Sequence, residues 1–210
     1  MSEINPLYLM AGLSILGLAP FFLMMVTSYV KIVVVTSLVR NALGVQQVPP
    51  AMVMNGLAII LSVFIMAPVA MDTADIVKTL PVPANPGPAD VIDLADRASP
   101  PLRRFLAANS DEKVTNMFMG TARRIWPAER HDMINMVPAF TISELTKAFQ
   151  IGFVLYLAFV AIDLIISNIL LAMGMMMVSP TTISLPFKLL LFVTLDGWLK
   201  ISQGLMLSYQ

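Results

Sequence analysis

The sequence predicts an all-α membrane protein: four long hydrophobic helices, arranged as two hairpins kinked at prolines, with a small helical insert between the second and third. The 210 residues are 58% hydrophobic and 12% charged, with a mean hydropathy of +0.81, whereas a soluble domain carries about 25% charged residues. Residues 72–147 hold ten of the thirteen acids and nine of the thirteen bases. We therefore expect a first hydrophobic hairpin (residues 1–71), a polar insert (72–147) and a second hydrophobic hairpin (148–210).

The composition excludes several classes of function. The absence of cysteine excludes disulfides, Cys-zinc sites and thiol chemistry, and a formal net charge of zero gives no general attraction to nucleic acid. The single histidine, His131, has no serine elbow to act with and no second histidine for a zinc site. No phosphate-binding or dinucleotide-binding fingerprint is present. We expect no enzyme activity, no metal and no cofactor.

The first hairpin starts with an uncharged run over residues 6–30, which is long enough to cross a hydrocarbon core of about 30 Å. Pro20 should kink or break this helix. Residues 31–47, which carry two bases and no acid, are expected to form a connecting loop. A second uncharged helix is expected over residues 51–71, because Pro49 and Pro50 suit its first turn.

The insert is expected to be partly helical. The proline-rich residues 81–88 predict an extended spacer. Short helices are expected over residues 101–108 and 110–124, the second with acids in its first turn and Arg123 and Arg124 in its last, as the helix dipole favours. The insert is too small to bury much core alone, so we expect it to lean on neighbouring chains.

The second hairpin should contain the third helix, over residues 149–173, and the fourth, over residues 189–207. A capping box from Thr141 to Glu144 predicts the start of the third helix, and Gly174 its end. A proline-bounded loop is expected over residues 178–186.

Three consecutive methionines, Met175, Met176 and Met177, follow Gly174. Methionine is unbranched and polarizable, so it fills irregular gaps and repacks against different partners. The cluster indicates either a soft gasket or a hydrophobic loop that packs on neighbouring helices, and composition alone favours the second.

Charged residues inside the apolar helices are candidate functional residues. An acid at membrane depth is costly, so Asp163 indicates a pathway, an ion pair or a subunit contact. Lys188 is its nearest candidate partner, within the hairpin or between adjacent copies. A proton relay is the alternative. Asp196 and Lys200 are spaced as an i,i+4 pair on one helical face, and we expect them to neutralise each other.

The topology follows from basic residues near short loops. Lys31, Arg40 and Lys188 place both loops in the cytoplasm. The insert and both termini would then lie on the outer, periplasmic side of the membrane.

Several motifs together resemble the FliP/SctR family, the core export-gate subunit of bacterial type III secretion systems and flagella. They cover nearly the whole chain and include Leu18-Ala-Pro-Phe-Phe22, Leu38-Val-Arg-Asn-Ala-Leu-Gly44, Ala148-Phe-Gln-Ile-Gly-Phe153, Ala172-Met-Gly-Met-Met-Met-Val178, Leu185-Pro-Phe-Lys-Leu189 and Leu195-Asp-Gly-Trp198. The match is weakest over residues 81–99. The chain starts almost at the first helix of the family, so it looks more like the injectisome branch than the flagellar one.

The resemblance implies a ring of five copies in the bacterial inner membrane, joined by small two-helix subunits and one larger export-gate membrane subunit. The ring would enclose the channel for unfolded secreted proteins, with inner-rod or needle proteins as further partners. The resemblance also implies that Met175, Met176 and Met177 line the inner constriction, and that Asp163 and Lys188 pair at subunit contacts. Much of the hydrophobic surface would face other subunits, in a cone raised out of the bilayer plane.

The leading functional hypothesis is therefore a pore-forming core subunit with a methionine gasket. An ion-coupled transporter that uses Asp163 is the alternative, although its helix has no second titratable group nearby to continue a proton pathway. An assembly scaffold without a conduit is a third hypothesis.

Overall fold

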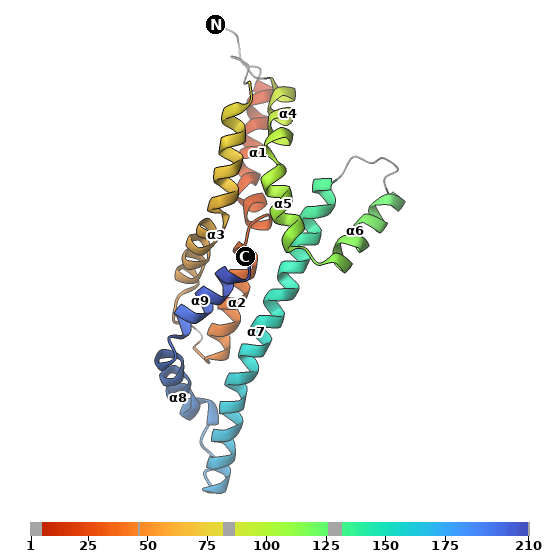
Figure 1. The fold of residues 1–210 in the computed structure, drawn as a ribbon. Coiled ribbons are helices and arrows are strands. Elements are labelled where there is room, and N and C mark those ends of the chain that lie inside the picture. The colour runs from red at the N-terminus through yellow and green to blue at the C-terminus, as the bar shows by residue number, and fades with distance from the viewer. Residues whose placement is uncertain (1–5, 46, 82–86, 126–131, 210) are drawn as a thin grey trace.

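The computed structural model describes residues 6–45, 47–81, 87–125 and 132–209, and every regular element in them is a helix (Figure 1). The helices are α1 (Pro6–Met25), α2 (Tyr29–Ala42), α3 (Ala51–Thr79), α4 (Pro88–Ala98), α5 (Pro100–Asn109), α6 (Glu112–Ile125), α7 (Asp132–Ala172), α8 (Pro180–Thr194) and α9 (Gly197–Leu207). The molecule is elongated: α1 and α4 lie at one end, and the turn between α7 and α8 forms the other (Figure 1).

The first apolar run is a bent pair of helices. α1 continues through Pro20 and ends at Met25, and α2 then leaves at 71° to the preceding segment Gly17–Met25. The expected loop over residues 31–47 is wrong, because residues 29–42 form α2. Its Val35 and Val39 are fully buried, so burial of this apolar face outweighs the charges on the helix.

α2 is the centre of the main core. It packs along α7 and against α3. The buried residues of this core come from five helices and from the end of α2: Ile32, Val35, Val39, Ala42, Leu43, Ala58, Ala148, Phe159, Phe192 and Leu205. A smaller cluster of Val26, Leu106 and Phe140 joins the break after α1 to α5 and α7. Residues 31–42, which the sequence predicts as part of a loop, therefore belong to the helix at the packing centre of the fold.

The insert packs on the upper part of the molecule. α3 continues past the expected end at residue 71 as far as Thr79, and it contacts α4 and α5. The expected helices over 101–108 and 110–124 correspond to α5 and α6. Part of the predicted spacer lies outside the described residues, and its last residue, Pro88, begins α4, where the Asp90 carboxylate accepts a hydrogen bond from the Gly87 N–H at 2.8 Å.

α7 is one continuous helix of 41 residues. The expected capping box is wrong, because Thr141 and Ser143 lie inside this helix. Their hydroxyls donate to the carbonyl oxygens four residues earlier, of Val137 and Ala139, at 2.8 and 2.7 Å. Because these hydroxyls bond to carbonyl oxygens within the helix, they are not available to cap its first N–H groups.

α7 ends in a Schellman motif. Gly174 has φ +75°, its N–H donates to the Leu171 carbonyl, and the Met175 N–H donates to the Leu170 carbonyl at 2.9 Å. α8 begins at Pro180, so the expected loop over 178–186 is wrong beyond Ser179. Proline at the first helical turn loses no hydrogen bond, which explains the early start.

The last apolar run is also a bent pair. α8 and α9 meet at 59°, and the corner residue Asp196 has φ 52°. The expected single helix over 189–207 is therefore wrong.

Two described helical segments are long and apolar enough to cross a membrane, α3 and Met133–Ala172, and there are up to four spans if each bent pair counts as one. The all-helical class is confirmed.

Candidate functional site

Asp163 of α7 and Lys188 of α8 are in direct contact. Lys188 Nζ lies 2.6 Å from Asp163 Oδ2, and it also donates to the Ala42 carbonyl oxygen, 3.1 Å away at the end of α2. The Ser184 hydroxyl donates to the other carboxylate oxygen of Asp163. The pair therefore connects three helices, α2, α7 and α8.

This ion pair is largely removed from solvent. The exposed fraction of the side chain is 6% for Lys188 and 27% for Asp163. The ammonium group meets the carbonyl end of α2, where the helix dipole favours a cation. A hollow of about 450 Å³ with both polar and apolar lining residues adjoins the pair, and its polar residues include Asn41, Tyr156 and Thr181. Loss of one partner would leave the other charge uncompensated, at a cost of about 3–5 kcal/mol.

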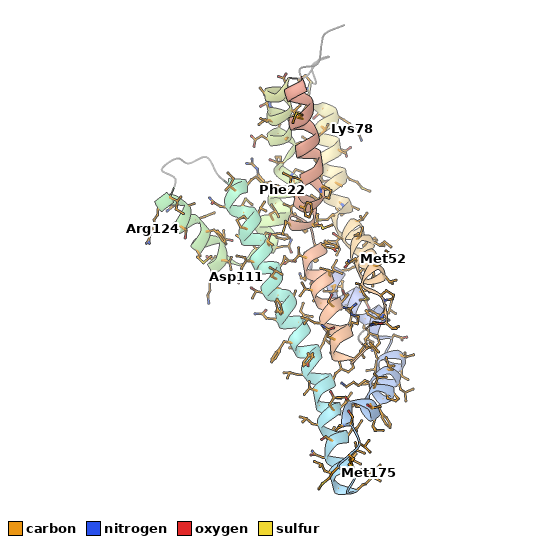
Figure 2. All side chains as sticks on the ribbon, turned by 180° about the vertical axis from the view of Figure 1, so that it is seen from behind. Phe22, Met52, Lys78, Asp111, Arg124 and Met175 are labelled. Carbon is orange, nitrogen blue, oxygen red and sulfur yellow. The ribbon has the colours of Figure 1, made fainter. Side chains whose placement is uncertain are left out.

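Met175, Met176 and Met177 lie at the far end of the molecule, in the turn between α7 and α8, where Figure 2 labels Met175. Their exposed fractions rise along the turn, from 41% to 81% and 101%. The turn itself is anchored by the Gly174 motif, so an ordered backbone presents three flexible side chains.

Asp196 and Lys200 do not form the expected ion pair in the part of the chain that the structure describes. Asp196 is the corner residue before α9, and its positive φ takes it off the helical face on which Lys200 lies. Only the backbones interact, with the Lys200 N–H donating to the Asp196 carbonyl at 3.0 Å.

The sequence reasoning missed a second buried ion pair, between Lys31 of α2 and Glu144 of α7. Lys31 Nζ lies 3.2 Å from Glu144 Oε2, and the two side chains are 1% and 0% exposed. Lys31 also donates to the Ser208 hydroxyl at 3.0 Å and lies 3.8 Å from the centre of the Tyr209 ring. The end of the chain thus folds back onto this pair.

Tyr209 completes the Glu144 site, because its hydroxyl donates to Glu144 Oε2. Burial, and secondarily the charge of Glu144, raise the pKa of the Tyr209 hydroxyl above its ordinary value. Tyr209 therefore keeps its proton and remains a donor across the physiological range.

The same turn of α7 also holds the insert. Lys147 Nζ donates to the Asn109 carbonyl at the end of α5, at 2.5 Å, and lies 3.4 Å from Glu144 Oε1. The Ser143 hydroxyl accepts from the Asp111 N–H, just before α6, at 2.8 Å. One helical turn therefore anchors α2, the chain end, α5 and α6 together.

The signal for Glu144 and Lys31 was present in the sequence. Each is a charge at the edge of an apolar segment, which is the argument that selected Asp163. The prediction from sequence places Lys31 in a loop and Glu144 in a helix cap, and neither placement brings the two residues together. Within the described ranges, no group of three or more potential metal ligands occurs; His131 lies outside them.

The buried positions of Lys31 and Lys188 also affect the predicted topology. The prediction from sequence treats both as loop charges on the cytoplasmic side, yet each lies inside a helix and has a protein partner. Of the three basic residues used, only Arg40, in the last turn of α2, lies near a loop.

Comparison with known proteins identifies the family. The FliP family model matches residues 12–205. The Yop proteins translocation protein R of Yersinia pestis is 51% identical over 213 residues, which are 99% of this chain and 96% of that protein. The hypersensitivity response secretion protein HrcR of Ralstonia nicotianae and the virulence protein YscR of Salmonella typhimurium are each 47% identical, covering 93% and 92% of both chains respectively. The chain therefore belongs to the FliP family, as its motifs predicted, and is an integral membrane component of the type III secretion export apparatus.

Proposed function

We propose that this chain is the pore-forming core subunit of the export gate. It conducts unfolded secreted proteins across the bacterial inner membrane, and Met175, Met176 and Met177 close the conduit between substrates. The exposed methionine turn at the tip of the molecule carries this proposal. The three methionine side chains at this end of the protein are 41%, 81% and 101% exposed, so they are available to close a shared opening.

The mechanics follow from the backbone around the turn. The Gly174 motif holds the turn at the end of α7, while each methionine has three rotatable bonds and repacks at low cost. Such a gasket seals against small ions and yields to a passing polypeptide of variable shape.

Neighbouring chains complete the conduit. The described chain leaves large apolar side chains exposed on α1, α3, α7 and α8, including Phe22, Phe64, Phe153 and Val193 at 60–70%. Surfaces of this size are covered by lipid or by other proteins. We propose a homo-oligomeric ring, five-membered as in the family, with small two-helix subunits, one larger membrane subunit and inner-rod or needle proteins as partners, and the insert on the periplasmic side.

Replacing Met175, Met176 and Met177 together by alanine tests the gate. Alanine removes the long side chains that fill the opening, so the assembled complex should leak small ions while its subunit composition stays unchanged. Conductance of the reconstituted complex in a planar bilayer measures this.

The matched control replaces Met117 and Met119 of α6, which are also exposed, and should leave conductance unchanged. Equal conductance in the triple variant and the unmodified complex would refute the gate assignment. A stalled substrate that cross-links to the methionine turn would exclude a scaffold without a conduit.

Asp163→Asn separates the pore from an ion-coupled transporter. The observed contacts of Asp163 with Lys188 and Ser184 favour a pairing role, so the variant should lose assembly or stability, because Lys188 is left buried without its counter-ion. Native gel electrophoresis measures assembly and a secretion assay measures transport. A fully assembled variant that has lost transport would instead support the transporter.

A further inference from the structure

The methionine turn is also a cluster of accessible thioethers. The exposed fraction of the side chain rises from Met175 through Met176 to Met177, and Figure 2 places Met175 at the tip of the molecule. Met54 of α3, by contrast, is 2% exposed. Oxidation of a methionine requires that the oxidant reaches its sulfur. The turn therefore presents three consecutive sulfur atoms to a small oxidant dissolved in water.

The backbone of the turn does not depend on these sulfur atoms. The Schellman motif at Gly174 holds the start of the turn. The Met176 N–H then donates to the Gly174 carbonyl at 3.0 Å, and the Val178 N–H donates to the Met175 carbonyl at 3.3 Å. All of these are main-chain hydrogen bonds. An oxygen atom added to an exposed side chain leaves them in place, so oxidation changes the polarity of the turn and keeps its position.

The reaction of a methionine with hydrogen peroxide needs no further reagent. A lone pair of the sulfur attacks one peroxide oxygen, so that an S–O bond forms and the O–O bond breaks. The sulfur is oxidised by two electrons, the peroxide is reduced, and water leaves. The apolar thioether becomes a polar sulfoxide, whose oxygen accepts hydrogen bonds, and methionine sulfoxide reductases reverse the change.

This change of polarity acts on a closed gate. A hydrophobic constriction stops ions because its apolar side chains exclude water. A sulfoxide oxygen in such a constriction is unfavourable without a hydrogen-bond donor, and it gains one when water enters. Each sulfoxide should therefore favour the hydrated, conducting state over the dry, closed state about tenfold.

We propose that Met175, Met176 and Met177 form a reversible oxidation site, and that their conversion to sulfoxides by a peroxide opens the closed gate to water and small ions. The effect on conductance rests on the proposed function, since it requires that the turn closes a conduit. The oxidation itself depends only on the access of peroxide to the turn. The site would make the leak through the conduit respond to the peroxide concentration around it.

Peroxide treatment of the complete reconstituted complex tests the proposal. Peptide mass spectrometry should find an added oxygen atom on the methionines of the turn and none on the buried Met54. Conductance in a planar bilayer should rise about tenfold, while the subunit composition stays unchanged. Methionine sulfoxide reductase, supplied with a thiol reductant, should then return the conductance to its starting value.

Replacing the three methionines of the turn by leucine provides an apolar turn that cannot be oxidised. Leucine has a similar volume and no sulfur, so peroxide should leave the conductance of this variant at the variant's own starting value. The matched control replaces Met117 and Met119 of α6 by leucine; these side chains are also exposed. The control should respond to peroxide as the unmodified complex does.

The proposal would be overturned by turn methionines that stay unoxidised, by sulfoxides at the turn without a rise in conductance, or by a rise that the reductase does not reverse. A rise that persists in the leucine variant would also overturn it. The alanine variant keeps the test of the gate separate. A leaking alanine variant beside an oxidised complex that stays tight would retain the gate and reject the oxidation switch. An alanine variant that stays tight would refute the gate, and with it the effect of oxidation on conductance.

Discussion

At the scale of single residues, the two buried ion pairs on α7 differ in how completely they are enclosed. Glu144 is 0% exposed and receives Lys31, Lys147 and the Tyr209 hydroxyl. Asp163 is 27% exposed, lines the hollow beside the pair and has two partners. Because a buried carboxylate depends on its donors to offset desolvation, Glu144 should be the more sensitive of the two to substitution.

Glu144→Gln should lower the free energy of unfolding by about 3–5 kcal/mol, because Lys31 then remains buried without a counter-ion. Denaturant titration of the detergent-solubilised protein measures it. Lys78→Ala removes the exposed pair with Asp75 and should change the same quantity by less than about 1 kcal/mol. Similar losses from both variants would contradict the structural role of Glu144.

At the scale of elements, the contact between α2 and α7 depends on one glycine. A Cβ at Gly152 would lie 2.3 Å from Leu38 Cδ1 and 3.0 Å from Leu38 Cβ. The two helices approach this closely only because Gly152 has no side chain, and this contact lies against the main core.

Gly152→Ala should therefore destabilise the protein by about 1–3 kcal/mol, through overpacking against Leu38. The matched control is Gly120→Ala in α6, where a Cβ meets nothing within 4 Å, and the better helix propensity should stabilise by about 0.5–1 kcal/mol. Adding Leu38→Ala to Gly152→Ala should relieve the clash. Thermal denaturation of the four proteins compares them; equal effects at both glycines would refute the close contact.

At the scale of the whole molecule, the exposed apolar surface predicts association. The detergent-extracted chain should appear in native mass spectrometry as a discrete homo-oligomer, and should gain mass when it is expressed with its small partner subunits. Lipid and detergent cover apolar surface without a fixed stoichiometry, whereas a protein interface gives one mass. A monomer in both preparations would contradict the shared pore.

The helical class could be predicted because hydropathy averages over about 20 residues and registers any long apolar helix. The bends between α1 and α2 and between α8 and α9 could not be predicted from the sequence. Val26 to Ser28 and Asp196 interrupt continuous apolar runs, and only the packing of α2 and α9 on the core explains where each helix turns. Local polarity misled the assignment of Lys31, whose charge is neutralised by a residue 113 positions away in sequence.

Some contacts of the candidate site could likewise be predicted from the sequence, and others could not. Asp163 and Lys188 could be selected because each is an isolated charge in an apolar run, and the structure places them 2.6 Å apart. Asp196 and Lys200 have the spacing of a helical pair, but spacing carries no information about a left-handed corner. The role of the methionine turn remains a proposal for the conductance experiment.

The continuity of α7 has a consequence for how such chains vary in length. Glu144 and Asp163 lie on this one helix, 19 residues apart, and contact different partners. Each residue inserted between them would rotate one carboxylate by about 100° relative to the other and shift it by about 1.5 Å, so one ion pair would break. We therefore expect an insertion or deletion in this segment to destabilise the fold, and we expect changes in length between relatives to lie elsewhere, for example in the loops of the insert.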